Sequence, residues 1–385
     1  MAERRLHVLI AGVSTRAVAV SAARAGYRVT AVDAFADLDL RAVAEVLPLR
    51  EDGGTRFSPA AAATLSRTVE ADAVAYTSNF ENYPEAVAAL AQGRRLLGNP
   101  AAVLRAVRNP IDLMRVLRHR EFRVPATRAT APPATLETHD WLLKPRRSGG
   151  GHGTTVWRIG RPISRRAYLQ ERIHGVTGSI VFAADGHRAV VLGLSRQLVG
   201  LRAFGARGFR YCGSLLASRR TPVFVHQAEL LARATELVQA VTESFGLRGL
   251  NGVDFVARDG VPFPIEVNPR YAASMELVER ATGASLFAIH LDACEGRLPP
   301  PRDLPRRVHG KAIVYARRNV VVADPHAWPV AAIADVPHAG ERIGRGHPIC
   351  TMLAEAADAD RCQRALADGA AAIYRVVEPR ARGAA

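Results

Sequence analysis

The sequence predicts an α/β protein that begins with a parallel unit of the nucleotide-binding kind and continues into a larger part built from hairpins and helices. Two observations carry this prediction. Strand-like and helix-like segments alternate over the first hundred or so residues, which is typical of a parallel sheet covered by helices. The chain has 385 residues, 48% of them hydrophobic, which is enough for two or three domains with real cores.

The N-terminal unit can be assigned element by element. Its expected strands are residues 5–13, 28–35, 73–78 and 95–98. Ser14 or Thr15 can cap the helix that follows the first strand and ends at Gly26, and a second helix is expected near 84–92. The order of strand and helix predicts parallel pairing.

The first turn of this unit argues against NAD. A dinucleotide fingerprint needs three glycines between the first strand and its helix, whereas this turn has Gly12 alone. Asp33 ends the second strand, as a ribose-binding acid would, but one acid is weak evidence. We expect Gly12 to serve a tight strand-to-helix turn.

Charge and cysteine usage exclude several classes of protein. The net charge of +16 and the pI of about 10.7 suit an anionic ligand, but the arginines are scattered without a long basic run, which argues against nucleic acid. Lysine occurs at positions 144 and 311 alone.

No apolar run reaches membrane-spanning length, and we expect the apolar start of the chain to be a buried strand rather than a signal peptide. The cysteines form no CxxC pair, which fits a reducing, cytoplasmic location; they are Cys212, Cys294, Cys350 and Cys362.

The rest of the chain reads as helices, short strands and two hairpins. Residues 99–120 are expected to be helical, and a proline-rich connector follows at 125–133. A hairpin should turn at Asp185-Gly186, and a long helix should cover about 225–245. After three prolines at 299–301, a smaller C-terminal unit begins with a strand at 310–317.

One strand ends at Lys144 and leads into the glycine-rich loop 146–154. Glycines expose backbone N–H groups and let them approach phosphates, and lysine adds a positive charge. The lysine precedes the glycines, so the loop is not a Walker motif. From the loop alone, a phosphate cradle and a flexible surface loop are equally good interpretations.

The segment NGVDFVARDGVPFPIEVNPR, residues 251–270, predicts a hairpin that carries charge. Glu266, Asn268 and Arg270 alternate along the return strand and share one face. A two-residue turn would put Asp254 on the opposite face from Glu266, and a three-residue turn with a left-handed Gly260 would put both on the same face. Two carboxylates and an amide oxygen on one face suit Mg²⁺, and an arginine beside them suits phosphate or carboxylate.

A strand-end lysine and a glycine loop come first, followed by the segment Gln170-Glu171-Arg172-Ile173 and then by the hairpin with Asp254 and Ile265-Glu-Val-Asn-Pro-Arg270. The order of these features resembles that of the ATP-grasp superfamily. The nearest members are its ATP-dependent carboligases and ligases related to biotin carboxylase. The resemblance covers nearly the whole chain. It implies an α+β grasp fold with a Rossmann-like pre-ATP-grasp domain at 1–98, a two-part ATP-grasp domain at 99–300 and a small β-rich C-terminal domain at 301–385.

The resemblance also implies roles for individual residues. Lys144 would contact ATP on its α-phosphate and adenine side, and backbone groups of Glu171, Arg172 and Ile173 would hold the adenine edge. The loop that would close over the outer phosphates contains Ser148, Gly149, Gly150, Gly151 and Gly153. One or two Mg²⁺, or Mn²⁺, would be bound by Asp254, Glu266 and Asn268. Arg270 would be the catalytic residue that holds the phosphorylated intermediate or the incoming carboxylate.

Two features of the family are missing. Asn109-Pro110 stands where an earlier lysine is usual, and Thr177-Gly178 replaces an acid after the hinge. Residues 198–214 are expected to form a mobile lid, or else an exposed basic loop. The side chains of this segment that could contact the acceptor substrate are Arg202, Arg207, Arg210 and Tyr211.

The resemblance implies a cytoplasmic enzyme that joins a small-molecule carboxylate to an amine through an acyl phosphate and releases ADP and phosphate. Such ligases serve cofactor or peptide-like amide biosynthesis, and the resemblance allows a homodimer. Two alternatives stay open: an ATP-dependent carboxylase that uses carboxyphosphate, and a non-catalytic protein that binds ATP or nucleic acid.

Overall fold

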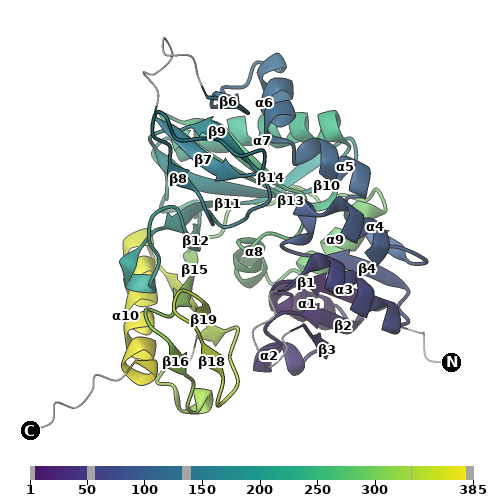
Figure 1. Ribbon diagram of the computed structural model, residues 1–385, viewed down its shortest axis with the longest axis vertical. Helices are drawn as coiled ribbons and strands as arrows, with labels where there is room; N and C mark the ends of the chain where they lie inside the picture. The colour runs from purple at the N-terminus through teal and green to yellow at the C-terminus, as the bar shows by residue number, and fades with distance from the viewer. Residues whose placement is uncertain (1–4, 50–56, 132–139, 331, 379–385) are drawn as a thin grey trace, which may run out of the picture.

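The computed structural model describes residues 5–49, 57–131, 140–330 and 332–378 (Figure 1). Residues 132 and 133, the end of the expected proline-rich connector, lie outside this part of the chain. The described strands form a five-stranded, an eight-stranded, a four-stranded and a two-stranded sheet. The N-terminal sheet lies at the lower right of Figure 1, and the C-terminal strands and helix lie at the lower left.

The N-terminal sheet is parallel throughout. Its strands lie in the order β3 (Glu45–Pro48), β2 (Arg28–Asp33), β1 (His7–Gly12), β4 (Ala73–Tyr76) and β5 (Arg95–Leu97). Every residue of β1 is buried because helices cover both faces of the sheet. Val8 and Ile10 face the cluster that contains α1 (Arg16–Arg24), while Leu9 and Ala11 face α3 (Pro59–Leu65) and α4 (Pro84–Leu90).

Gly12 and Asp33 both have structural roles at the carboxyl edge of this sheet. A Cβ atom on Gly12 would lie 1.8 Å from Thr77 Oγ1, so glycine is required where the end of β4 approaches. The Asp33 carboxylate accepts hydrogen bonds from the Thr15 amide and hydroxyl at 2.6 and 2.7 Å, and from the amides of Phe35 and Ala36 at 2.7 and 2.8 Å. These bonds fix the two loops that leave β1 and β2.

The expected helix at 99–120 is two helices, α5 (Ala101–Val107) and α6 (Pro110–His119). Pro110 has no amide hydrogen to continue α5, and it suits the first turn of a new helix. The Asn109 side chain accepts a hydrogen bond from the Ile111 amide and so caps α6. The break places Arg108 at the end of α5, where its side chain enters the central cavity.

The four-stranded sheet carries the glycine loop. Its antiparallel strands lie in the order β6 (Thr127–Arg128), β9 (Ala167–Glu171), β7 (Trp141–Pro145) and β8 (Thr155–Val156). The loop 146–154 connects β7 to β8, as expected from the strand-end lysine.

The eight-stranded antiparallel sheet joins the middle of the chain to its C-terminal part. Its strands lie in the order β14 (Val261–Asn268), β13 (Arg248–Arg258), β10 (Val176–Asp185), β11 (Ala189–Val199), β12 (Tyr211–Leu216), β15 (Val308–Tyr315), β19 (Pro348–Ala356) and β17 (Ile333–Ala334). The helices that pack on it are α7 (Gln227–Phe245), α8 (Met275–Thr282), α9 (Leu286–Cys294) and α10 (Ala359–Val377).

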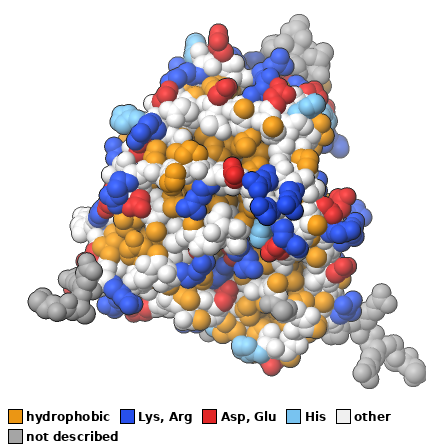
Figure 2. All heavy atoms as spheres, turned by 180° about the vertical axis from the view of Figure 1, so that it is seen from behind, with side chains coloured by type: hydrophobic (Ala, Val, Ile, Leu, Met, Phe, Trp, Pro, Cys, Tyr) orange, Lys and Arg blue, Asp and Glu red, His pale blue; other side chains and the backbone are white. Residues whose placement is uncertain are grey.

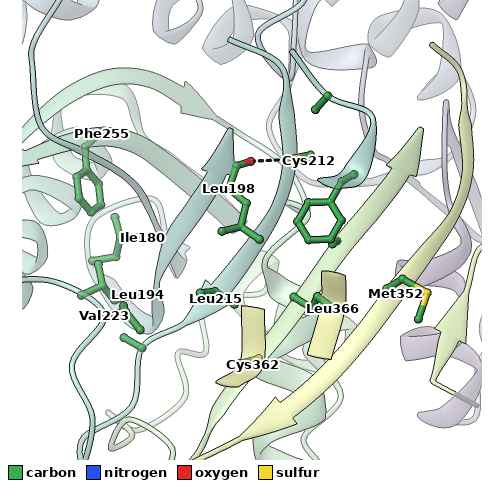
Figure 3. Packing of buried hydrophobic residues seen from close by; sticks show 14 of the residues in the cluster. Ile180, Leu194, Leu198, Cys212, Leu215, Val223, Phe255, Met352, Cys362 and Leu366 are labelled. Carbon is green, nitrogen blue, oxygen red and sulfur yellow. Dashed lines mark hydrogen bonds between the residues drawn. The ribbon is translucent and has the colours of Figure 1, made fainter. Parts of the chain in front are cut away.

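One hydrophobic cluster continues from the middle of this sheet into the C-terminal segment (Figure 3). Phe255, Ile180 and Leu194 pack at one end, and Met352 and Leu366 at the other. Strands β12 and β15, which pair from Gly213 to Leu216 and from Ala312 to His309, connect the two ends. The C-terminal segment is therefore packed firmly against the rest of the chain.

The surface fits the scattered pattern of basic residues in the sequence. On the face seen in Figure 2, Lys and Arg side chains form separate groups that hydrophobic and acidic side chains interrupt. In the described part of the chain, no helix is both long and apolar enough to cross a lipid bilayer.

Candidate active site

The carboxylate hairpin consists of β13 and β14. Its turn has two residues, Asp259 and Gly260, with φ of 52° and 71°. Such a turn alone would put Asp254 and Glu266 on opposite faces. A bulge at Ile265 shifts the register by one residue, so that Asp254 and Glu266 are direct partners on one face. Of the two turns considered from the sequence, the structure has the shorter one, and the bulge restores the shared face.

The two facing carboxylates have different surroundings. Arg108 Nη1 lies 2.7 Å from Glu266 Oε1 and 2.9 Å from the Val267 carbonyl oxygen. Burial acts to raise the pKa of Glu266, but the charges of Arg108 and then Lys144 outweigh it, so the pKa lies below its usual value. Burial and then the charge of Glu266 raise the pKa of Asp254 to about 6.

Asn268 completes an oxygen-rich face with these carboxylates. Its Nδ2 donates to Asp254 Oδ2 at 3.0 Å, and its Oδ1 accepts from Arg270 Nη2 at 3.2 Å with one lone pair left over. The described residues contain no group of three or more His, Cys, Asp or Glu placed to hold a metal ion, and the protein ligands that this face offers are two carboxylates and one amide oxygen. Two carboxylates and an amide oxygen fit Mg²⁺, which prefers oxygen ligands and keeps positions for phosphates.

Arg270 is held from two sides. Its Nη2 lies 2.8 Å from Glu81 Oε1, and its Nη1 donates to the Tyr271 carbonyl oxygen at 3.0 Å. Glu81 comes from the N-terminal unit and is 1% exposed. Arg270 Nε and Glu81 Oε2 are buried and have no hydrogen-bond partner among the described residues. A buried arginine with an unused donor is suited to bind an anion.

Lys144 lies at the end of β7 beside the carboxylate face. Its Nζ donates to Gln170 Oε1 at 2.9 Å, and it lies 5.8 Å from the centre of the Tyr168 ring. Gln170 Nε2 reaches the Ile265 carbonyl oxygen at 3.4 Å, which connects the lysine to the bulge of the hairpin. No carboxylate neutralises Lys144 in direct contact within the described chain, so its charge is available to a ligand.

The glycine loop meets the segment 198–214, whose two ends are paired residues of β11 and β12 and so are not part of a mobile lid. Gly150, Gly151 and Gly153 have φ of 60°, 74° and 73°. The Tyr211 amide donates to the Gly150 carbonyl oxygen at 3.0 Å. A Cβ atom on Gly151 would lie 1.9 Å from the carbonyl oxygen of Phe209, so the two segments touch through backbone.

The hinge segment offers fewer backbone donors than its sequence suggests. The Glu171 amide donates to the Ala126 carbonyl oxygen at 2.8 Å, and the Arg172 amide donates to that of Asp140 at 2.7 Å. The amide of Ile173 makes no hydrogen bond with the described residues. Ile173 is therefore the hinge residue whose N–H group can meet a ligand.

One cavity of about 910 Å³ collects these groups. Of the residues assigned from the sequence, it is lined by Lys144, Ser148, Gly149, Gly150, Gly151, Glu171, Arg172, Ile173, Asp254, Glu266, Asn268 and Arg270. Gly153 lies outside its wall. From the expected lid, Arg210 and Tyr211 line the cavity, whereas Arg202 and Arg207 do not. The Arg210 guanidinium lies 3.9 Å from the centre of the Tyr315 ring.

Two residues of the site were missed from the sequence. Arg108 is the ion-pair partner of Glu266, and Glu81 is the ion-pair partner of Arg270. The position of Arg108 directly before the helix-breaking Asn109-Pro110 was a usable signal, because a cation was missing from that stretch. The sequence contains no such signal for Glu81. This residue follows β4 in the N-terminal unit, and no motif links that unit to the hairpin.

Comparison with known proteins gives one family and a consistent fold. Residues 107–274 match the ATP-grasp domain family. An uncharacterized protein of Methanocaldococcus jannaschii, MJ0776, is 24% identical over 372 residues, which cover 91% of this chain and 88% of that protein.

Two solved structures share the fold along nearly the whole chain. A biotin carboxylase of Campylobacter jejuni has a TM-score of 0.74 at 12% identity and covers 93% of this chain and 89% of its own. An L-amino acid ligase of Bacillus licheniformis has a TM-score of 0.67 at 16% identity and covers 95% and 97%. At these identities the likeness concerns the fold.

Proposed function

The chain is an ATP-grasp protein related to biotin carboxylase, and from this premise we propose that it is an ATP- and Mg²⁺-dependent ligase that joins a carboxylate to an amine. One observation carries the proposal. The two facing carboxylates, the glycine loop, Lys144 and the partly satisfied Arg270 line the same cavity. These groups are what phosphoryl transfer to a carboxylate requires, namely charge neutralisation and positioning.

Asp254, Glu266 and Asn268 would hold one or two Mg²⁺ ions. The fit rests on their oxygen donors and on the burial and the charge of Glu266 that together raise the pKa of Asp254. When bound, the metal supplies charge neutralisation at the outer phosphates. Arg108 neutralises one oxygen of Glu266 and so limits the negative charge of this face.

The nucleotide would lie between the two antiparallel sheets. Lys144 would approach the α-phosphate, and the loop from Ser148 to Gly153 would cover the outer phosphates with backbone N–H groups. Because the amides of Glu171 and Arg172 are already used, the N–H group of Ile173 would contact the adenine edge. Glu171 and Arg172 would then contribute their carbonyl groups and the shape of the hinge.

Arg270 would hold the carboxylate and the acyl phosphate formed from it. A carboxylate oxygen attacks the γ-phosphorus of ATP, the bond to the bridging oxygen breaks, and ADP leaves. The amine nitrogen then attacks the acyl carbon, phosphate leaves with the C–O bonding electrons, and the nitrogen loses a proton. Arg270 lines the cavity, and Glu81 fixes the orientation of its guanidinium.

A carboxylase that forms carboxyphosphate is the second candidate, because the fold is also that of biotin carboxylase. Both reactions release ADP and phosphate, and they differ in what receives the activated group. Bicarbonate alone would support the carboxylase, whereas the ligase needs an organic carboxylate together with an amine.

The test is chromatography of nucleotides after incubation of the full chain with Mg-ATP and pooled carboxylates and amines. We expect ADP and phosphate to form in proportion to amide. AMP with pyrophosphate would contradict the acyl phosphate, because it requires attack at the α-phosphate. ADP formation that depends on bicarbonate and is indifferent to the amine pool would favour the carboxylase.

A further inference from the structure

Three acids that lie near one another line part of the cavity wall. Asp37 precedes α2 (Leu38–Arg41), and Asp335 and Glu341 come from the C-terminal turns next to β17 and β18 (Arg342–Ile343). All three line the cavity that holds the candidate active site. The walls therefore combine the carboxyl edge of the N-terminal sheet, where open α/β sheets bind ligands, with the C-terminal segment.

Most of the charges around Asp37 are already satisfied. Arg16 pairs with Asp335 at 2.9 Å and with Glu276, and Lys311 pairs with the other oxygen of Glu276. Asp39 accepts the amides of Asp335 and Val336 at 2.9 and 3.0 Å. Asp33 is bound by the four donors described above. Arg16 and Lys311 are thus committed to other acids, and Arg41 Nε and His338 Nε2 lie against the Ala36 carbonyl oxygen at 3.1 and 2.8 Å.

Asp37 differs from these neighbours. It is 6% exposed, and its carboxylate has no hydrogen-bond or ion-pair partner among the described residues. It caps α2 by position, yet its side chain accepts no bond from the helix. An unpaired buried carboxylate is costly. In a chain with a net charge of +16, the missing partner is not explained by a shortage of basic residues.

The surroundings of Asp37 also disfavour its ionised form. Burial, and then the carboxylates of Asp335, Asp33, Asp39 and Glu341, raise the pKa of Asp37 to about 9. A cation bound beside Asp37 would relieve this repulsion and let the group ionise.

We propose that Asp37 and its acidic surroundings form a subsite for a cationic group of the amine substrate, and that this group is not the amine that reacts. A group held by a carboxylate as an ammonium has its lone pair bonded to a proton, so it cannot attack an acyl carbon. The substrate thus carries a second, reactive amine, which makes it a diamine or a basic amino compound. This inference rests on the proposed carboxylate–amine ligase and deepens it.

The experiment compares diamines with amino alcohols of equal length, in which a hydroxyl replaces one ammonium. Binding of the series 1,3-diaminopropane to 1,5-diaminopentane to the full chain is measured by calorimetry, with and without Mg-ADP. We expect at least one diamine to bind on the order of tenfold more tightly than its amino alcohol. Asp37→Asn should remove this preference, because it keeps the shape and an acceptor oxygen but loses the charge.

Asp39→Asn is the control for a purely structural role. The Asp39 carboxylate accepts two backbone amides and pairs with Arg16 at 3.4 Å, so its loss should lower the Tm, whereas replacing the unpaired carboxyl of Asp37 should leave the Tm equal or higher. Equal binding of diamines and amino alcohols by the native chain would overturn the inference. So would a preserved preference, or a marked fall of the Tm, in Asp37→Asn.

Binding without turnover separates the two proposals. If diamines bind through Asp37 but no amine supports ADP formation, the ligase is wrong and the cation subsite stands. If amines support ADP formation without any preference for diamines, the ligase stands and the subsite is wrong.

Discussion

At the scale of single residues, the metal assignment depends on Glu266. Glu266→Gln keeps the shape of the side chain and removes the charge that a divalent cation needs. We expect turnover to fall by about three orders of magnitude, because removing an electrostatic contact to the reacting phosphates costs on the order of 10²–10³ or more. Arg108 keeps its bonds to Val267 and Asn82, so the Tm should change little.

Glu85→Gln is the matched control for this variant. Glu85 also pairs with an arginine at 2.7 Å, but its side chain is 81% exposed on α4. It should keep normal turnover. Near-normal activity in Glu266→Gln, measured as phosphate release under saturating Mg-ATP, would show that the metal lies elsewhere.

The two lysines of the chain should respond in opposite ways. Lys144 contacts one amide oxygen and faces the cavity, so Lys144→Ala should weaken ATP binding roughly ten- to a hundredfold, the loss of one charge-assisted contact, with little change in Tm. Lys311 is 5% exposed and pairs with buried Glu276, so Lys311→Ala should cost about 3–5 kcal/mol of stability. Calorimetry with ATP and thermal unfolding check both; unchanged ATP affinity in Lys144→Ala would remove this lysine from the nucleotide site.

The sequence predicted the site residues that lie within motifs. It missed the site residues that lie outside motifs and reach the same cavity from other parts of the chain. Lys144, Glu266 and Asn268 could be identified because each lies in a short string whose spacing has a chemical reason. Arg108 and Glu81 reach the same cavity from α5 and from the loop after β4. Their roles depend on how the N-terminal sheet packs against β14, and no local pattern encodes that packing.

At the scale of elements, the contact between glycine loop and lid gives a sharp prediction. Gly151→Ala places a Cβ 1.9 Å from the Phe209 carbonyl oxygen in a left-handed conformation, so the glycine loop and the segment around Phe209 must separate. We expect the KM for ATP to rise on the order of tenfold, because the phosphates lose ordered backbone donors. The measurement is the dependence of phosphate release on ATP concentration.

Gly149→Ala serves as the internal control for the loop. A Cβ on Gly149 would meet no atom within 4 Å, and its φ is not in the left-handed range. The KM for ATP should stay near its normal value in this variant. Equal effects of the two substitutions would mean that the loop acts through its flexibility and not through its contact with Phe209.

The hairpin shows where element-level prediction fails. The alternation of polar residues predicted the shared face of Glu266, Asn268 and Arg270, but the period of two could not show the bulge at Ile265. Pro262 and Pro264 were the physical hint, since proline donates no ladder bond and is found in edge strands and at bulges. Strand β14 is indeed at the edge of its sheet.

At the scale of the whole molecule, buried polar groups tie the segments together. Glu276 of α8 receives Arg16 from α1 and Lys311 from β15. Burial acts to raise the pKa of Glu276, but Lys311 and Arg16 hold it well below its usual value. A depressed carboxyl pKa stabilises the fold above the unfolded pKa of about 4.3, and that contribution is lost as the pH falls further. Acid below pH 4 should therefore loosen all three segments.

His290 should dominate the change of stability in a second, less acidic range of pH. It lies on α9, and its Nδ1 accepts a hydrogen bond from the Leu250 amide at 2.8 Å. Its Nε2 lies 3.2 Å from the carbonyl oxygen of Leu97 in β5. Nδ1 must stay unprotonated to accept, so the buried ring is neutral in the fold, and burial lowers its pKa to about 4. Between that pKa and the unfolded value of about 6.5, the unfolded chain binds the extra proton.

Stability should consequently fall as the pH drops from 6.5 to 4, by about 3 kcal/mol from His290 if each pKa unit contributes about 1.4 kcal/mol. His290→Gln removes the titration, and its stability should change less across this window than that of the native chain. His7, His152 and His309, whose pKa values burial also lowers, remain in both proteins, so the difference between the two curves isolates His290. Parallel curves from denaturant unfolding at pH 4 to 7 would show that His290 takes up its proton within the fold, and that the contact between α9 and β5 tolerates a charge.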